Sequence, residues 1–197
     1  MRVFLNRDTV FDKECHKALR HLSHFAHWYE AEFKREHDYA HIRGESNVIR
    51  YLKVHSVLLR VEDNDDFVEV LATLLLVKML GIQLHVSIPL HSRRAEYIWL
   101  ESKENSLLDK DDAIVREDES HLISSIASCE RVRFLNPQNV SQNVYEKLAL
   151  SAKYIASTPF IAHGRIELMH YFIEQSVTNS YHRYGNLGIQ GLTFKGV

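Results

Sequence analysis

The stretch 56–88 reads SVLLRVEDNDDFVEVLATLLLVKMLGIQLHVSI, and it decides the fold class. It holds two short apolar runs, Val57–Val61 and Leu84–Ile88, and a longer helical pattern lies between them. Runs of this continuous kind are typical of strands that are covered on both faces. The whole unit has about thirty residues, the usual length of a right-handed strand–helix–strand crossover. The stretch therefore predicts a parallel sheet.

The central helix has start and stop signals of its own. Asn64 or Asp65 can cap its first turn, it runs to about Leu80, and Gly81 stands where a left-handed residue commonly ends a helix. Its apolar residues lie nearly all round the helix, which predicts deep burial: they are Phe67, Val70, Leu71, Leu74, Leu75 and Val77.

Downstream of this unit, weaker helix and strand patterns alternate. Helices are expected at 92–101, 119–128, 144–152 and 165–174, and strands at 113–116, 132–135, 154–156 and 177–184. The last helix is expected to bury Ile166, Met169, Phe172 and Ile173. Such alternation predicts an α/β, Rossmann-like fold, with a mostly parallel sheet and helices on both faces.

Upstream of the unit, a long helix is expected from Asp12, its presumed N-cap, to Glu36. Its buried face recurs at three and four residues, which predicts that the helix covers something apolar: Leu22, Phe25, Ala26, Tyr29 and Phe33. Gly44–Asn47 is interpreted as a linker turn with local hydrogen bonds from Ser46 or Asn47. The expected organisation is an N-terminal helix and loop (1–46), a degenerate Rossmann-like domain (47–175) and an extended C-terminal docking tail (176–197).

Composition excludes several classes of protein. The chain has 197 residues, and 24 Lys and Arg against 26 Asp and Glu give a formal charge of -2. This balance predicts neither nucleic acid nor an anionic membrane as a partner. The first residues, MRVFLNRD, are charged too early for a signal peptide, and no apolar run reaches the about 20 residues of a membrane helix. Two distant cysteines favour the reducing cytoplasm.

The first turn after a strand is where a Rossmann fold binds a dinucleotide. Here it reads Arg60–Asp66, RVEDNDD, with no glycine to let the backbone approach a pyrophosphate. Carboxylates at the start of the next helix complement its dipole themselves and repel phosphate. We therefore expect this chain to bind no cofactor.

Candidate nucleophiles and metal ligands are few. Cys129 is followed by Glu130, which is expected to raise the thiol pKa, and Cys15 and His16 are neighbours that point to different faces of a helix. The histidines at 21, 24 and 27 have a spacing that could chelate zinc, but a solvated helical face explains them as well. No catalytic residue and no metal site is predicted.

Three segments have no explanation in core packing or turn chemistry. They are 27–38 (HWYEAEFKREHD), 43–51 (RGESNVIRY) and 174–188 (EQSVTNSYHRYGNLG). In this order they resemble the C-terminal region of the long forms of proline utilization A, where an aromatic-rich helix leads into an "HD…GE-N-RY" segment and the chain ends near "YHRYGN-G". The similarity runs from about Ala18 to Gly188, and its terminal blocks are more specific than its middle, 90–142.

That resemblance implies a function. Long proline utilization A enzymes join an FAD-dependent proline dehydrogenase to an NAD-dependent L-glutamate γ-semialdehyde (pyrroline-5-carboxylate) dehydrogenase. Their extra C-terminal domain resembles an aldehyde dehydrogenase Rossmann domain without its catalytic apparatus, and it is thought to pack over the aldehyde dehydrogenase domain and help enclose the substrate-channelling tunnel. The resemblance implies that this chain is non-catalytic, that FAD and NAD belong to the parent enzyme, and that its partners are the catalytic domains of the same polypeptide.

Planar, hydrogen-bonding side chains and glycine turns make the C-terminal block a candidate docking tail. The predicted docking residues are Tyr181, His182, Arg183, Tyr184, Gly185, Asn186, Trp28 and Tyr29. The alternative is that this tail only completes the domain's own sheet. Two other functions stay open: an NAD-binding dehydrogenase fragment and a free-standing protein-interaction adaptor. Exposed docking surfaces would also favour a homo-oligomer.

Overall fold

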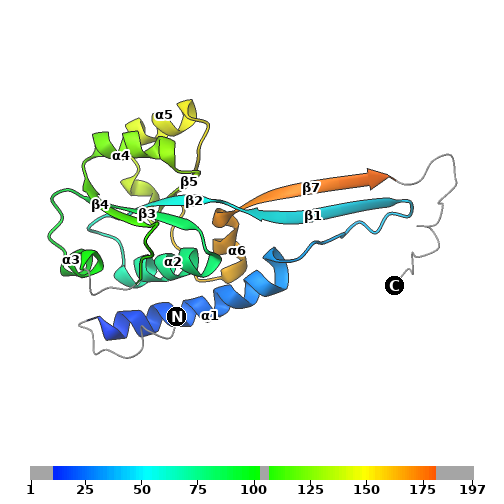
Figure 1. Ribbon diagram of the computed structural model, residues 1–197, viewed down its shortest axis with the longest axis horizontal. Coiled ribbons are helices and arrows are strands. Elements are labelled where there is room, and N and C mark those ends of the chain that lie inside the picture. The colour runs from blue at the N-terminus through cyan, green and yellow to red at the C-terminus, as the bar shows by residue number, and fades with distance from the viewer. Residues whose placement is uncertain (1–10, 103–106, 181–197) are drawn as a thin grey trace.

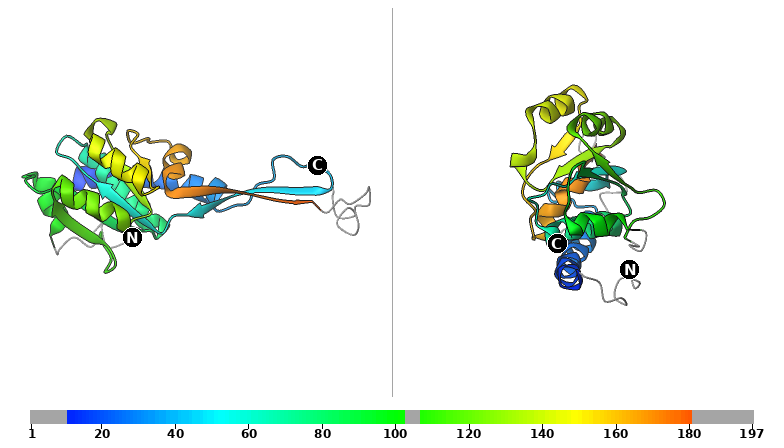
Figure 2. Two further views of the ribbon diagram at one scale, coloured as in Figure 1. Left: turned by 90° about the horizontal axis from the view of Figure 1, so that it is seen from above. Right: turned by 90° about the vertical axis from the view of Figure 1, so that its left-hand side faces the viewer.

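The computed structural model describes residues 11–102 and 107–180 of the chain. They form a layered α/β body and a two-stranded arm that projects from one end of it (Figure 1). Seen from above, the arm extends well away from the body (Figure 2).

The body is built on a parallel sheet of five strands, in the order β4-β3-β2-β5-β6. The strands are β2 (Ser56–Arg60), β3 (Gln83–Pro89), β4 (Ala113–Glu117), β5 (Arg131–Phe134) and β6 (Tyr154–Ala156). The chain moves outward from β2 to β4 and then returns to β5 on the other side of β2, so the strand order reverses between β2 and β5. The predicted Rossmann-like fold is confirmed.

Helices cover both faces of this sheet. On one face lie α2 (Phe67–Leu80) and α3 (Ala95–Glu101), and on the other lie α4 (Glu119–Ser125) and α5 (Gln142–Leu150) (Figure 1). The side chains of β2 alternate between the two layers, as a strand dictates. Val57 and Leu59 join the core on the α2 side, and Leu58 joins Val132 and Phe134 in the core on the α4 and α5 side.

Helix α2 is buried as predicted, because it is enclosed from two sides. One side packs on the sheet and the other packs against α1 (Asp12–Trp28), which buries Ala18, Leu22 and Phe25 there. The cap of α2 is Asp66, whose carboxylate accepts from the Val68 N–H, and not the expected Asn64 or Asp65. Gly81 ends the helix in the left-handed conformation, at φ 65°, as predicted.

The N-terminal helix begins and ends differently from the prediction. Asp12 is its first helical residue and Phe11 is the N-cap. After Trp28 the helix continues only as one π-helical turn, Tyr29–Phe33, and the expected extension to Glu36 is wrong. The Lys34 N–H donates to the Tyr29 carbonyl at 3.0 Å, the bond to the fifth preceding residue that defines such a turn.

The arm consists of two antiparallel strands of nine residues each, β1 (Glu45–Lys53) and β7 (Phe172–Ser180). The prediction of a linker turn at Gly44–Asn47 is wrong beyond Gly44, because Glu45 to Asn47 already belong to β1. Five of the nine residues of β1, ESNVIRYLK, are charged or polar, so its sequence lacks the apolar run that identified the strands of the body. Both expected domain boundaries, at 46/47 and 175/176, fall inside the strands of the arm.

The last expected helix is also corrected. Helix α6 (Gly164–Leu168) and a 3-10 turn (Met169–Tyr171) end at Phe172, where β7 begins. The spacing of Ile166, Met169, Phe172 and Ile173 imitates a helical face, but Ile166 and Met169 are 47% and 52% exposed. Phe172 is buried as expected, and the other buried residues of this segment are Gly164, Glu167, Leu168, His170 and Tyr171. Within 11–102 and 107–180, no helix is long and apolar enough to span a bilayer.

Candidate docking arm

The crevice where Rossmann folds bind ligands lies where the strand order reverses, outside the ends of β2 and β5. Two side-chain amides from the loops that follow these strands join across it. Asn64 Nδ2 donates to Asn139 Oδ1 at 3.2 Å, and Asn139 Nδ2 donates to Asn64 Oδ1 at 2.8 Å. Asn139 Nδ2 also lies 3.3 Å from an Asp65 oxygen. The chain's own side chains therefore bridge this crevice.

The polar groups around the crevice are occupied as well. A phosphate at the start of α2 would use backbone N–H groups of the first turn. One of these, the Val68 N–H, already donates to the Asp66 carboxylate at 2.7 Å. Burial raises the pKa of Asp65, and the nearby Glu62 carboxylate adds to that shift. The Arg60 guanidinium donates to Glu62 at 2.7 Å through Nε. The Arg94 guanidinium donates to the Asp65 carbonyl at 2.6 Å. Asp66, Arg60 and Arg94 thus all bond to other groups of the chain.

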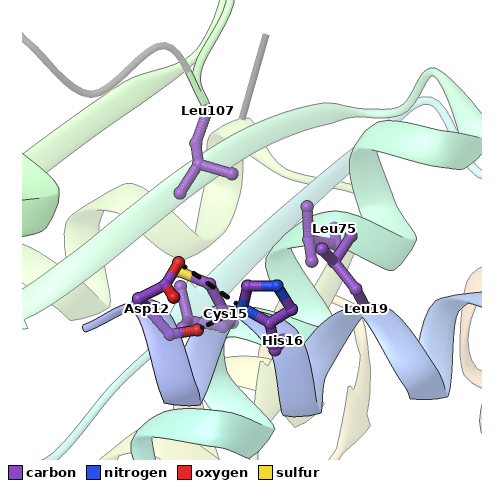
Figure 3. Close-up of a pocket in the computed structure, with 7 residues that line it drawn as sticks. Asp12, Cys15, His16, Leu19, Leu75 and Leu107 are labelled. Atoms are coloured by element: carbon purple, nitrogen blue, oxygen red, sulfur yellow. Dashed lines mark hydrogen bonds and ion pairs between the residues drawn. The ribbon is translucent and has the colours of Figure 1, made fainter. Parts of the chain in front are cut away.

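The thiol of Cys129 is not activated by its surroundings. Burial raises the pKa of the Cys129 thiol, which is the predicted direction, although the cause is desolvation and not the neighbouring Glu130. Cys15 and His16 both line a cavity of about 20 Å³ between α1 and α2, with the remaining lining residues Asp12, Leu19, Leu71, Leu75 and Leu107 (Figure 3). His16 Nδ1 lies 2.8 Å from the Asp12 carbonyl oxygen, so the imidazole bonds along its own helix.

Two of the three spaced histidines of α1, His21 and His24, contact the segment before α6, whereas His27 packs edge-on against Trp28. His21 packs edge-on against Phe160, with ring centroids 5.3 Å apart. His24 Nε2 accepts the Trp28 indole N–H at 3.1 Å, so the ring proton is on Nδ1, which lies 3.2 Å from the Ala162 carbonyl oxygen. Among the described residues, no group of three or more histidine, cysteine, aspartate or glutamate side chains is arranged to hold a metal ion.

The arm presents an aliphatic face to solvent. Opposite residues of an antiparallel pair point to the same side, and the register places Val48 opposite Val177 and Leu52 opposite Ile173 on one side. Leu52, Ile173 and Val177 are 42%, 43% and 41% exposed. Between the two aliphatic pairs, Arg50 donates to Gln175 at 2.6 Å. We call the four aliphatic residues, Val48, Leu52, Ile173 and Val177, the aliphatic face of the arm.

The outer edge of β7 is open over the described residues. β1 is its partner on one side, and no other described strand pairs with it. The outer edge of β1 is partly covered, because His37 and Ile49 exchange backbone hydrogen bonds of 2.9 and 2.8 Å. β7 carries one charged residue, Glu174, and no proline, so it lacks the features that usually protect an edge strand.

At its root, the arm is packed against the π-helical turn. Phe33 contacts the rings of Tyr51 and Phe172, with centroid distances of 4.6 and 4.8 Å, and Tyr29 stacks on Phe172 at 6.2 Å. On the body's side, the Arg131 guanidinium donates to the carbonyls of His170 (2.9 Å) and Phe172 (3.4 Å). The root is therefore tied to α1 and to β5.

A carboxylate orders the loop that leads into β1. Asp38 accepts from the N–H groups of Ala40 (3.2 Å) and His41 (3.0 Å) through one oxygen, and from Asn47 (3.0 Å) through the other. These backbone donors, that of Asn47 first, hold the pKa of Asp38 below its usual value. The segments 27–38 and 43–51, which core packing did not explain, thus form the arm and its root.

The predicted docking residues are only partly described. Tyr181, His182, Arg183, Tyr184, Gly185 and Asn186 lie outside the described residues. Trp28 packs near His163 where α1 meets α6, and Tyr29 packs at the root of the arm. Sequence reasoning did not identify the aliphatic face, because 48–52 (VIRYL) and 173–177 (IEQSV) do not alternate apolar and polar residues.

Comparison with known proteins places the fold. The chain matches solved proline utilization A from Corynebacterium freiburgense with a TM-score of 0.52 and 23% identity, over 90% of this chain and 14% of that one. A variant of proline utilization A from Bradyrhizobium japonicum gives a TM-score of 0.50 and 16% identity, over 75% of this chain and 17% of that one. An aldehyde dehydrogenase-like protein from Bacillus subtilis gives 0.51 and 12%, over 76% and 34%.

These likenesses show that the chain has the α/β fold found in proline utilization A and in aldehyde dehydrogenase-like proteins. It spans between 14% and 34% of the length of these matched proteins. No protein-family profile matches the chain, and no curated protein matches its sequence.

Proposed function

We propose that the chain is a non-catalytic domain of a bifunctional enzyme that converts proline to glutamate. In this proposal it packs on the aldehyde dehydrogenase domain and helps enclose the tunnel that carries the intermediate. The observation that carries the proposal is the arm, whose aliphatic face is exposed. A two-stranded ribbon is marginally stable by itself in water, so a covering surface would stabilise it.

The closed crevice supports the non-catalytic part of the proposal. Asn64 and Asn139 join across the position of a dinucleotide, and Asp66 occupies the start of α2. The Cys129 thiol is not activated, since burial raises its pKa. We therefore propose that FAD and NAD are bound by the catalytic domains and not by this chain. Two cysteines far apart in the sequence suit the reducing cytoplasm, which we propose as the compartment.

The position of the resemblance supports the choice of enzyme. The segments shared with proline utilization A, 43–51 and 174–177, form most of the arm, and segment 27–38 forms its root. Solved proline utilization A also shares the fold. We propose the catalytic domains of the same polypeptide as the partner, the aliphatic face as the principal contact, and Trp28, Tyr29 and Tyr181–Asn186 as further docking residues.

A binding experiment with matched variants tests the proposal. The 197-residue chain is mixed with the proline dehydrogenase–aldehyde dehydrogenase polypeptide encoded in the same genome, produced without this region, and association is measured by sedimentation velocity. We expect a complex that is lost in Leu52→Asp and Val177→Asp. Ile98→Asp serves as the control, because Ile98 is an aliphatic residue of α3, 55% exposed and away from the arm.

Two outcomes would contradict the proposal. The first is the absence of a complex, together with unchanged aldehyde oxidation and unchanged coupling of the two activities when the chain is added. The second is binding of NAD to the isolated chain at submillimolar concentration in a calorimeter, which would favour the dehydrogenase-fragment alternative. We expect no NAD binding, because the crevice is bridged by Asn64 and Asn139.

A further inference from the structure

Glu32 is a buried carboxylate at the junction of the arm and the body. The residue is 9% exposed, and it lies in the π-helical turn next to Phe33, which is also buried. A π-helical turn inserts an extra residue into the helix and so changes which side chains face inward. Because of this turn, two consecutive side chains, one charged and one aromatic, both face the root of the arm.

One oxygen of Glu32 collects hydrogen bonds from three other segments. Oε1 accepts from the Tyr51 hydroxyl of β1 at 3.0 Å, from the Tyr39 hydroxyl of the preceding loop at 3.2 Å, and from an Arg165 N–H of α6 at 3.2 Å. The Glu32 backbone carbonyl is 2.8 Å from His37 Nε2, and His37 in turn pairs with β1. A single residue therefore links α1, the loop, the arm and α6.

The electrostatics at this junction favour the ionised carboxylate. Burial opposes ionisation of Glu32, but the hydrogen bonds from Arg165, Tyr51 and Tyr39 and the charge of Arg165 outweigh it and hold the pKa below its usual value. Hydrogen bonds to an ionised acceptor are stronger than neutral ones. In contrast, Arg50 and Glu36 form an ion pair at 3.5 Å that is largely exposed, with 43% and 61% of the side chains accessible.

We infer that Glu32 is the residue that fixes the direction of the arm relative to the body. The arm is joined to the body by Val54 and His55 after β1 and by the 3-10 turn before β7, and the Val54 N–H donates to the Tyr171 carbonyl at 3.1 Å, so the two connections form one junction. Aromatic packing at the root, Phe33 against Tyr51 and Phe172, is apolar and non-directional. Arg131 makes directional bonds to the root on the side of β5, and the carboxylate supplies those that link the arm to the loop and to α6 and so select one orientation. This inference does not depend on the proposed function.

Pulsed electron resonance on the full 197-residue chain tests it. Spin labels are placed at Asn179→Cys, on β7, and at Leu150→Cys, on α5 and 87% exposed, in a background with Cys15→Ser and Cys129→Ala. We expect one narrow distance distribution that broadens and shifts in Glu32→Ala and stays unchanged in the control Glu36→Gln. Glu32→Gln keeps an acceptor oxygen but loses the charge, so it should broaden the distribution less than Glu32→Ala.

A second variant keeps the test decisive if Glu32→Ala does not fold. Arg165→Met removes one hydrogen-bond donor of the junction. Because the Arg165 side chain is 51% exposed, this substitution leaves no cavity in the core. It should broaden the distribution while circular dichroism shows an intact body. A distribution in folded Glu32→Ala or Arg165→Met that equals that of the unchanged chain would overturn the inference. Equal broadening by Glu36→Gln would also overturn it.

Discussion

Aliphatic side chains are mostly buried in the body of this molecule and partly exposed in its arm. In the body, the aliphatic side chains of β2 are buried on both faces of the sheet, and α2 is enclosed between the sheet and α1. In the arm, the aliphatic side chains of Leu52, Ile173 and Val177 are about two-fifths exposed. The body is complete as a folding unit, whereas the arm has an uncovered face and an open edge among the described residues. We propose from this difference that the body supplies stability and the arm supplies contact.

The largest effect on stability is expected in the body. Glu167 receives two hydrogen bonds from Arg133, at 3.0 and 3.2 Å, and both side chains are fully buried. Glu167→Ala would leave the guanidinium without its counter-charge and should cost about 3–5 kcal/mol of unfolding free energy. Urea denaturation measures this. The control is Glu30→Ala in the exposed Glu30–Lys34 pair, where the cost should stay below about 1 kcal/mol.

A smaller loss is expected where α1 crosses the start of α6. A Cβ on Gly164 would stand 2.8 Å from the His24 carbonyl oxygen and 2.9 Å from Trp28 Cδ1. Gly164→Ala must therefore separate the two helices, at a cost of about 1–3 kcal/mol. Thermal unfolding measures the change. A melting temperature equal to that of the unchanged chain would mean that α1 and α6 do not pack this closely.

The pH dependence should come from the junction between body and arm. Burial lowers the pKa of His170 from 6.5, and Arg133 and Arg131 lower it further, while Glu167 opposes them. Thr158 Oγ1 lies 3.0 Å from its Nε2. Because folding favours the neutral imidazole, its contribution is complete above about pH 6.5 and decreases as the pH falls from there toward the lowered pKa. Stability measured between about pH 7 and pH 5 should fall less steeply in His170→Gln than in the unchanged chain.

The smallest effect on stability is expected at the aliphatic face. Val177→Asp changes an exposed residue, so the unfolding free energy should move by no more than about 0.5 kcal/mol. The same substitution is expected to abolish docking. If Val177→Asp destabilises the chain as much as Gly164→Ala, the arm is part of the core and the contrast between body and arm fails.

The sequence predicted the body well, because the strands of a parallel sheet and the apolar helix α2 carry strong local patterns. Gly81 and the apolar residues of α2 were located correctly for that reason. The arm was missed because its strands pair across more than a hundred residues, Glu45 with Ser180. Such long-range pairing cannot be predicted from a short stretch of sequence. Glu32 was missed because its three donors come from positions 39, 51 and 165.

Amide hydrogen exchange tests the central claim most directly, because it observes the arm and the crevice in one experiment. The isolated chain should show slow exchange in β2, β3 and β5 and faster exchange in β1 and β7, since the arm has fewer buried contacts. When the proline dehydrogenase–aldehyde dehydrogenase polypeptide is added, protection should increase in β1 and β7 and stay unchanged at Asn64 and Asn139. New protection at the crevice without any at the arm would contradict the account.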